Sequence, residues 1–346
     1  MSEGSATRIE FGLDTFGDMT VDDAGVPQPA GQVIRNVIEE AVLADSLGVD
    51  HFSVGEHHRD DFAVPAPDMV LAGIASRTTR ITLGTAVTVL STDDPVRVYE
   101  RFAILDAISS GRAEITAGRG SFTESFALFG YSLGEYDVLF EERLDLLVRL
   151  LGEEAVTWSG RTRSALDRQQ VYPKTERGHI PLRVAVGGTP ESVVRAARHR
   201  LPMALAIIGG DPHRFRPFAE LYRRALQEFG HAPQPLSIHS PGHIADTDAQ
   251  AADELWPHYQ AAFGRIGRER GWPPPTRERF DAEVRAGSLL VGSPGTVARR
   301  IASTVTELGA QRVDLKYSTG TLPHSRLMRS IELYATEVIP RVRELV

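Results

Sequence analysis

The sequence of 346 residues contains no cysteine and only two lysines. The lack of cysteine excludes disulfide bonds, thiolate metal sites and a cysteine nucleophile, and it is compatible with a reducing compartment. No stretch approaches the roughly 18 apolar residues that a membrane-spanning helix requires. The first ten residues, MSEGSATRIE, carry acidic side chains and lack the apolar run of a signal peptide. We therefore expect a soluble, cytoplasmic protein that does not enter a membrane.

Positive charge is also scarce relative to negative charge. Lys and Arg number 38 against 46 Asp and Glu, which gives a formal net charge of −8. The arginines are scattered among acidic residues, so the chain lacks the basic patch with which proteins bind nucleic acids. With 42% hydrophobic and 24% charged residues, the composition is that of an ordinary globular protein.

Short apolar runs alternate with longer amphipathic ones from residue 8 onward, a pattern typical of βα units on a parallel sheet. Strands are predicted at 8–15, 49–54, 80–90, 112–118, 181–187, 202–208, 235–245 and 311–318. These units predict an α/β fold, a (β/α)₈ TIM barrel, which we expect to form a single domain over residues 1–346. Two insertions exceed what the barrel needs: a small β excursion is expected at 152–181 and a helical cover of the barrel mouth at 246–290.

A polar cluster follows the second predicted strand, where barrels of this kind carry their active sites. Adjacent residues of an extended chain point to opposite faces, so at most one of His57 and His58 can face the barrel mouth. This divergence argues against a metal site built from both histidines. Two interpretations stay open: a structural histidine bonded to Glu56 or Asp61, or a histidine that donates and accepts protons near neutral pH.

The fourth predicted strand ends in AGRGSF, which places Arg119 between two glycines. Glycines let the backbone approach a ligand closely, and a guanidinium can hold a phosphate through two parallel hydrogen bonds. A dinucleotide fingerprint would need glycine at position 123, where the chain has Thr123. An ordinary surface turn is the structural alternative.

The fifth predicted strand ends in GGTPES, with Gly188 before Thr189 as the expected N-cap and Ser192 in the first turn. The free amides of a helix N-terminus and nearby hydroxyls can bind an anion. A similar stretch, GSPGT at 292–296, precedes another predicted helix. Spacing alone does not decide which of the two binds a phosphate.

Lys316 lies near the end of the eighth predicted strand. A Schiff-base lysine would need a desolvated pocket or a cationic neighbour to lower its pKa. Pairing with Glu56 or with an aspartate at the barrel rim is the structural alternative.

Taken in order, these motifs resemble those of the bacterial luciferase-like flavin-dependent monooxygenases, and the resemblance spans nearly the whole chain. The matching stretches are FGLDTF (11–16), GEHH (55–58), LGTAVTVLSTDDPVRVYE (83–100), LDAISSGR (105–112), AGRGSF (117–122), LPMALA (201–206), LVGSP (290–294) and EVIPRVREL (337–345). The resemblance implies a (β/α)₈ barrel with reduced flavin across its mouth, and a homodimer or a higher homo-oligomer.

The resemblance also implies roles for individual residues. His57 matches the family's active-site histidine, and a non-proline cis peptide is expected between Ala86 and Val87, beneath the flavin ring. Arg119 matches the phosphate-binding arginine. The family's helix-terminus phosphate cradle matches Gly188, Thr189 and Ser192, which leaves residues 292–296 as a plain helix cap.

Two departures from luciferase indicate that the chain emits no light. It has Gly118 where luciferase has a reactive cysteine, and Ile207 where luciferase has a tryptophan. The resemblance implies a monooxygenase that uses reduced FMN and O₂, through a flavin C4a-peroxide, to oxygenate a small organic substrate. Because no nicotinamide fingerprint is present, a separate flavin reductase is expected to supply the reduced FMN. The alternatives are a deazaflavin-dependent hydride-transfer enzyme, a Schiff-base aldolase and a non-enzymatic flavin-binding protein.

Overall fold

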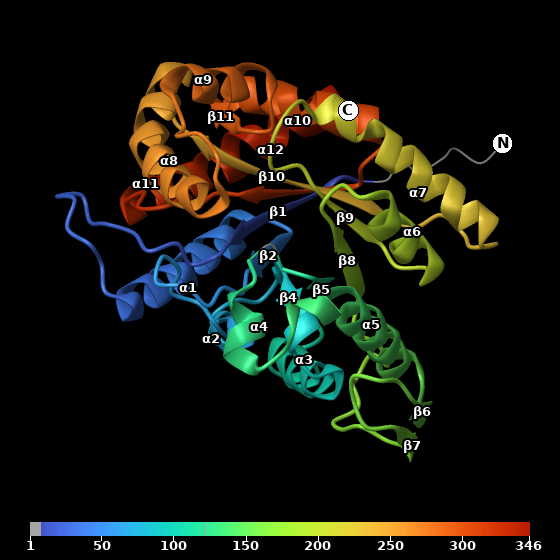
Figure 1. Cartoon of the computed structure of the whole chain (residues 1–346). Helices are drawn as coiled ribbons and strands as arrows, with labels where there is room; N and C mark the ends of the chain where they lie inside the picture. Colours follow the sequence, from blue (N-terminus) through green and yellow to red (C-terminus); the bar gives the residue numbers. More distant parts are fainter. Residues whose placement is uncertain (1–7, 121) are drawn as a thin grey trace.

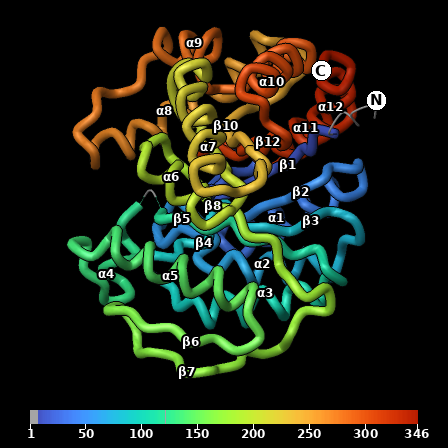
Figure 2. Tube along the Cα trace, turned by 90° about the vertical axis from the view of Figure 1, so that its right-hand side faces the viewer, coloured from blue at the N-terminus to red at the C-terminus, as the bar shows by residue number. Residues whose placement is uncertain are grey.

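A computed structural model describes residues 8–120 and 122–346. Most of the N-terminal stretch interpreted above, residues 1–7, and Ser121 of the AGRGSF motif lie outside the described residues. The main sheet is parallel and curls into a nearly closed barrel surrounded by helices (Figures 1 and 2). Around the barrel its strands are β3 (Thr82–Thr85), β2 (His51–Val54), β1 (Glu10–Thr15), β12 (Arg312–Lys316), β10 (Leu236–Ile244), β9 (Met203–Ala206), β8 (Leu182–Val186), β5 (Ile115–Gly118) and β4 (Thr88–Val89).

The predicted strand 80–90 is split in two. Its first half, β3, pairs with β2, and its second half, β4, pairs with β5. A parallel bridge between Leu83 and Ala113 joins the two ends of the sheet. Every other predicted barrel strand is found as a single strand, so the TIM-barrel prediction is confirmed.

Helices cover the outside of the barrel, as their apolar stripes predict. Their bounds are α1 (Ala30–Leu47), α2 (Pro67–Ala75), α3 (Pro95–Ser109), α4 (Glu124–Phe129), α5 (Tyr136–Gly152), α6 (Pro190–Arg198), α7 (Arg216–Glu228), α8 (Asp248–Arg270), α9 (Arg277–Ala286), α10 (Pro294–Leu308), α11 (His324–Leu333) and α12 (Ile339–Leu345). The expected caps are present: the Val96 amide donates to the Asp94 side chain over 2.9 Å, and Gly48 ends α1 with φ of 83°.

Both insertions have the expected structure. In the first, β6 (Val156–Trp158) and β7 (Leu166–Gln169) form an antiparallel hairpin beyond α5. The second contains α8 and α9 (orange in Figure 1), and both views place them on the side of the molecule away from the hairpin. Two elements were not predicted: α4 and the three-residue β11 (Leu290–Gly292), which pairs with β10.

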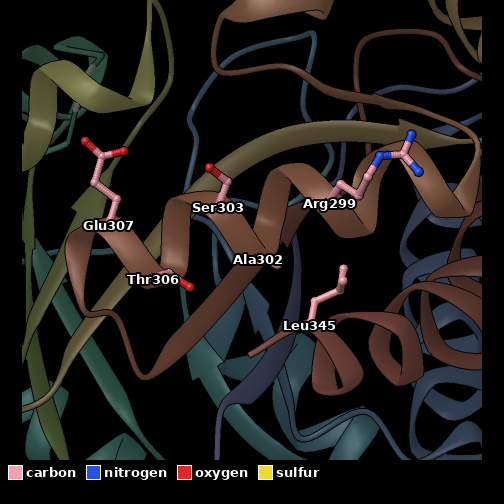
Figure 3. Close-up of a pocket in the computed structure, with 6 residues that line it drawn as sticks. All are labelled: Arg299, Ala302, Ser303, Thr306, Glu307 and Leu345. Atoms are coloured by element: carbon pink, nitrogen blue, oxygen red, sulfur yellow. The ribbon is translucent and has the colours of Figure 1, made fainter.

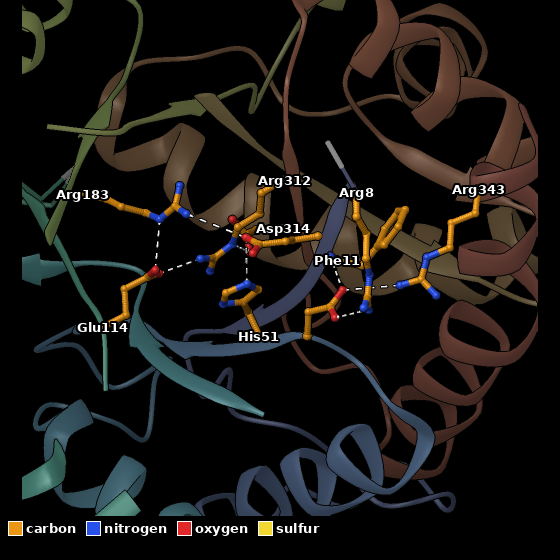
Figure 4. A network of polar contacts seen from close by, with 10 residues as sticks. Arg8, Phe11, His51, Glu114, Arg183, Arg312, Asp314 and Arg343 are labelled. Atoms are coloured by element: carbon orange, nitrogen blue, oxygen red, sulfur yellow. Dashed lines mark hydrogen bonds and ion pairs between the residues drawn. The ribbon is translucent and has the colours of Figure 1, made fainter. Parts of the chain in front are cut away.

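Buried charges fill the amino-terminal part of the barrel interior (Figure 4). Arg312 lies 2.6 Å from Glu114 through Nη1 and Oε1, and Arg183 Nε lies 3.1 Å from the other oxygen of Glu114. Burial alone would raise the pKa of Glu114, but these two arginines hold it well below its ordinary value. Because ion pairs occupy this end, space for a ligand can exist only toward the carboxyl ends of the strands.

No helix in the described part of the chain is both long enough and apolar enough to cross a membrane.

Candidate active site

The side chains that face inward in the carboxyl half of the barrel leave it partly open. On β9, Met203 and Leu205 are completely buried. Ala204 and Ala206, which alternate with them, keep partial exposure and therefore face the barrel interior. Ala185 of β8 lies beside Ala204 in the strand register and is partly exposed too. The short alanine side chains leave room at the mouth, where enzymes with this fold bind substrates.

His57 follows β2 and lies at this mouth inside an aromatic cluster. Its ring centroid is 4.3 Å from that of Phe62, 4.7 Å from that of Phe16 and 5.1 Å from that of Phe122. Burial, reinforced by the positive charge of Lys316, lowers the pKa of His57 to about 4. The imidazole is therefore neutral near pH 7, where one ring nitrogen can accept a hydrogen bond and the other can donate one.

His58 points elsewhere and has a structural partner. Its Nε2 lies 2.9 Å from Oε1 of Glu56, and Oε2 of Glu56 accepts the amide of Val89 over 3.0 Å. The structural interpretation of a histidine bonded to Glu56 thus applies to His58, and only His57 joins the aromatic cluster. Among the described residues, no three His, Cys, Asp or Glu side chains gather in a way that could hold a metal ion.

Phe122 covers His57 on one side. The hollow that Glu56, His57 and Phe122 border has a volume of about 10 Å³, room for about one water molecule. The guanidinium groups of Arg59 and Arg270 lie 4.8 and 5.0 Å from the centroid of the Phe122 ring and hold it in place. A ring that is to contact His57 from this side must first displace Phe122.

The peptide bond between Ala86 and Val87 is cis, as predicted, and it separates β3 from β4. Both residues are partly exposed. Two glycines let neighbouring strands approach this bond: a Cβ atom on Gly55 would lie 2.8 Å from the Ala86 carbonyl oxygen, and one on Gly118 would lie 2.5 Å from Cγ2 of Val87. Gly118 is therefore required by its contact with Val87, and a cysteine does not fit there.

Arg119 follows β5 and is partly exposed. Its Nη1 lies 2.9 Å from Oδ1 of Asp137, and its guanidinium lies 5.2 Å from the ring centroid of Tyr136. Both partners belong to the start of α5. Gly120 next to it has φ of 75°, a conformation that favours glycine.

The predicted cradle forms the start of α6, and no side chain caps this helix. Thr189 occupies the N-cap position, but its hydroxyl bonds to the hydroxyl of Ser192 instead of a backbone amide. The Ser192 hydroxyl also lies 3.2 Å from the Thr189 carbonyl oxygen. Gly188 precedes them with φ of 97°. The N-terminal amides of α6 are thus left without a side-chain acceptor.

The start of α10, at residues 292–296, is different because a carboxylate of the chain already occupies it. Oδ1 of Asp248 accepts the amide of Ser293 over 2.7 Å, and Oδ2 accepts the Thr296 hydroxyl over 3.0 Å. Burial alone would raise the pKa of Asp248, but these hydrogen bonds lower it. The structure therefore favours α6 over α10 as the helix terminus that is free to bind an anion.

Helix α5 brings Arg119 and α6 toward each other. Asp137, one turn before Glu141 on α5, pairs with Arg119, and Glu141 pairs with Arg195 of α6. Arg119 and Arg195 also both lie close enough to Tyr136 to act on its pKa, which burial raises. Helix α5 thus carries the ion-pair partners of both Arg119 and α6.

Lys316 is not free. Its Nζ lies 3.0 Å from Oδ2 of Asp18 and 4.5 Å from the ring centroid of Phe16. The expected pairing with an aspartate at the barrel rim is confirmed, with Asp18 as the partner.

One pair of polar residues was missed. Nε2 of His239 on β10 lies 3.1 and 3.2 Å from the two carboxylate oxygens of Asp14 on β1. Both residues interrupt apolar stretches of the sequence, FGLDT and PLSIH. That interruption was a signal in the sequence, but nothing in it showed that the two residues meet.

The helical insertion covers the mouth. Glu269 near the end of α8 pairs with Arg59 in the loop after β2, and His258 of α8 lies 2.8 Å from the hydroxyl of Thr321, which follows β12. A larger hollow, about 430 Å³, lies elsewhere, on the outside of the barrel between α10 and Leu345 (Figure 3). None of the predicted site residues lines it.

A sequence model of the family described as "Luciferase-like monooxygenase" matches residues 15–312. The chain is 26% identical over 322 residues to 4-hydroxyprotoasukamycin monooxygenase of Streptomyces nodosus subsp. asukaensis, which covers 88% of this chain and 85% of that protein. It superposes with a TM-score of 0.83 on the monooxygenase RslO1 of Streptomyces bottropensis, at 27% identity over 96% of this chain and 99% of that one.

Two more distant structures share the fold alone. The oxygenating constituent of 3,6-diketocamphane monooxygenase of Pseudomonas putida, in complex with FMN, gives a TM-score of 0.79 at 20% identity, over 96% of this chain and 98% of that one. An F420-dependent secondary alcohol dehydrogenase gives a TM-score of 0.75 at 16% identity, and the match covers 97% of this chain and 99% of that one.

Proposed function

Because this chain belongs to the luciferase-like monooxygenase family, we propose that it is a flavin-dependent monooxygenase that uses reduced FMN and O₂ to oxygenate a small organic substrate. The family membership makes it an oxidoreductase. The observation that carries the choice of FMN is the uncapped start of α6, together with Arg119, whose ion-pair partner lies on α5, the helix that also pairs with α6. This arrangement suits the phosphate group that distinguishes FMN from riboflavin.

Opposite charge and hydrogen bonds from the chain would hold the phosphate. The terminus of α6 contributes free amides and partial positive charge, and Thr189 and Ser192 add hydroxyl donors. Arg119 can exchange its exposed partner Asp137 for a phosphate, because the exposed ion pair is weak. Gly188 lets the backbone approach the phosphate without a side chain in the way.

The cis peptide of Ala86 and Val87 and the alanine wall of β8 and β9 would hold the flavin ring at the mouth. Bound reduced FMN supplies the electrons that activate O₂. The chain orients it, excludes water and handles protons. The neutral His57 would accept one hydrogen bond from the flavin or donate one to it, once Phe122 has moved aside.

Helix α8 closes the site over the substrate and keeps water out, since it is tied to the loops after β2 and β12. A separate flavin reductase delivers the reduced FMN, because position 123 is Thr123 and the chain lacks a dinucleotide fingerprint. A cytoplasmic location fits this dependence on a reduced flavin and the absence of cysteine.

A homodimer is part of the proposal. Large apolar side chains are exposed on neighbouring helices α2 and α3, namely Met69, Ile104 and Ile108. An exposed apolar patch of this kind favours association. A second copy of the chain buries it most simply, through a two-fold interface that pairs the same surface of both copies.

A deazaflavin-dependent hydride-transfer oxidoreductase is the second candidate, because the fold is shared with an F420-dependent dehydrogenase. A non-enzymatic flavin-binding protein would use the same phosphate site without consuming substrate. A Schiff-base aldolase loses support because Lys316 is paired with Asp18.

The test is an anaerobic titration of the apoprotein with reduced FMN, riboflavin and the deazaflavin F420, followed by admission of O₂. We expect reduced FMN to bind more tightly than riboflavin and F420, and O₂ to reoxidise it on the protein. Tight binding of F420 with weak binding of FMN would favour the hydride-transfer enzyme. A panel of aldehydes, cyclic ketones and terpenes then separates the remaining candidates, because only a monooxygenase incorporates an atom of labelled O₂ into product.

A further inference from the structure

We propose that His239 is a second catalytic residue, which donates a proton to oxygen at the barrel mouth, and that Asp14 is the residue that positions it. The inference rests on the proposed flavin-dependent function and deepens it. It concerns the wall of the mouth formed by β9, β10 and β12, whereas His57 lies beyond β2, with β1 and β12 between.

Asp14 orients the imidazole of His239. Its side chain is completely buried, and both of its carboxylate oxygens lie within 3.2 Å of Nε2 of His239. Burying a carboxylate costs free energy unless a partner compensates for the lost hydration. The partner here is the His239 imidazole, so the buried carboxylate fixes the orientation of that ring and stabilises its charged form.

The other side of His239 is open. Its side chain keeps 17% of its surface exposed, and it is the one partly exposed residue of β10. No hydrogen bond to Nδ1 is found within residues 8–120 and 122–346. In the strand register His239 stands beside Ala206 of the alanine wall. The ring thus has one nitrogen held by Asp14 and the other available at the mouth.

The surroundings separate this pair from the structural ion pairs below it. Lys316 and Asp314 of β12 face His239 from one side, and β9 presents only alanine from the other. Glu114 and Arg312, by contrast, are sealed in the barrel interior (Figure 4). A purely structural ion pair does not need a partly exposed ring nitrogen. His239 has one because it lies at the open end of the barrel.

The two histidines differ in the proton they can supply. Burial lowers the pKa of His57. Burial acts in the same direction on His239, but Asp14, through its charge and its hydrogen bond, raises the pKa above the ordinary value. Near neutral pH His239 is therefore the more protonated of the two imidazoles and the better proton donor.

The overall reaction requires that proton. In the monooxygenase reaction, the anion of reduced FMN reacts with one proton, O₂ and the substrate. The products are FMN, oxygenated substrate and water. Two electrons come from the flavin and two from the substrate; one oxygen atom forms the new bond to substrate, and the other leaves as water with the added proton. Without substrate, the same anion, one proton and O₂ give FMN and hydrogen peroxide. His239 supplies the proton in both cases and regains it from solvent.

The first test needs no turnover. Apoprotein labelled with ¹⁵N-histidine is titrated with oxidised FMN while the ring nitrogen signals are followed by NMR, with His239→Gln to assign the signal. We expect the His239 signal to move as FMN saturates the protein and the signal of the exposed His179 to stay in place. If FMN binds and moves the His57 signal alone, the inference fails and the proposed function stands. If FMN does not bind, the proposed function itself fails.

The second test follows reoxidation of bound reduced FMN by O₂ across pH without substrate. His239→Gln should slow reoxidation about tenfold or more and flatten its pH dependence, with the affinity for oxidised FMN unchanged. Asp14→Asn should keep the pH dependence but shift it to lower pH, because the raised pKa of His239 is lost. His179→Gln is the control and should match the wild type. Equal rates and profiles in His239→Gln and the wild type would overturn the proposal.

Discussion

The guanidinium of Arg119 and the carboxylate of Asp137 form an ion pair, with Nη1 2.9 Å from Oδ1. The Arg119 side chain is 27% exposed and that of Asp137 is 76% exposed. A pair this exposed contributes little to stability, so a phosphate can take the place of the carboxylate. This relationship allows the phosphate assignment to be tested from both partners.

Arg119→Ala should weaken FMN binding about tenfold to a hundredfold, because a charge-assisted hydrogen bond contributes about 1.5–3 kcal/mol. Riboflavin, which lacks the phosphate, should bind both proteins equally. Isothermal titration measures both affinities.

Asp137→Asn supplies the matched control, because it removes the competing negative charge beside Arg119 and leaves the guanidinium in place. FMN should bind to it as tightly as to the wild type, or more tightly. Equal losses of FMN and riboflavin binding in Arg119→Ala would show that Arg119 supports the fold and not the phosphate.

The stability of the protein should depend on pH through His57. Its pKa is about 4 in the folded protein, against about 6.5 in an unfolded chain. Between these two values the unfolded chain binds a proton that the folded protein does not, so stability falls as the pH falls from about 6.5 to about 4. The full contribution, about 3 kcal/mol, is present above pH 6.5 and lost below pH 4.

His57→Phe removes this titration and keeps a ring in the aromatic cluster. Urea unfolding at both ends of the pH range should therefore show a smaller loss of stability in His57→Phe than in the wild type. His179→Gln, at an exposed position, should behave as the wild type does. Identical pH dependence in all three proteins would contradict the buried, neutral state of His57.

Arg59 ties the helical cover to the barrel. The side chain is 8% exposed, and its Nη1 lies 2.7 Å from both Glu124 of α4 and Glu269 of α8. Arg59→Met leaves these carboxylates without their main cation and should destabilise the protein by about 2–3 kcal/mol. Amide hydrogen exchange in the last turns of α8 should become faster.

Arg265 is the matched control on the same helix. It also pairs with carboxylates of the loop after β2, but its side chain is 37% exposed. Arg265→Met should therefore cost less than about 1 kcal/mol. If the two variants lose similar stability, burial of Arg59 is not what holds α8 in place.

The barrel could be predicted because each strand and helix carries its own periodic signal. Asp94 and Gly48 mark helix ends through local chemistry that the chain spells out within a few residues. The two missed elements lack such signals: α4 has six residues, and β11 has three and forms only because β10 extends past the barrel to pair with it.

The candidate site was predictable where a motif carries the function and not where distant residues meet. His57 and Arg119 each follow a strand within a recognisable motif. Asp14 and His239 are 225 residues apart, and Arg59 and Glu269 are 210 apart. The strand register and the path of α8 bring these pairs together, and neither can be derived from local sequence.

The exposed apolar surface of α2 and α3 should form a dimer interface. Ile104 and Ile108 lie one turn apart on α3 and share a face, and Met69 is exposed on the neighbouring α2. Ile104→Glu with Ile108→Glu places two charges on each side of a two-fold interface, where they meet their own copies and lose hydration. Analytical ultracentrifugation should show a dimer for the wild type and a monomer for this double variant. Leu345→Glu, at an exposed position on α12, should leave the dimer intact. If the double variant stays dimeric, the interface lies elsewhere on the surface. If the wild type is monomeric, the proposal that this apolar patch is a dimer interface is wrong.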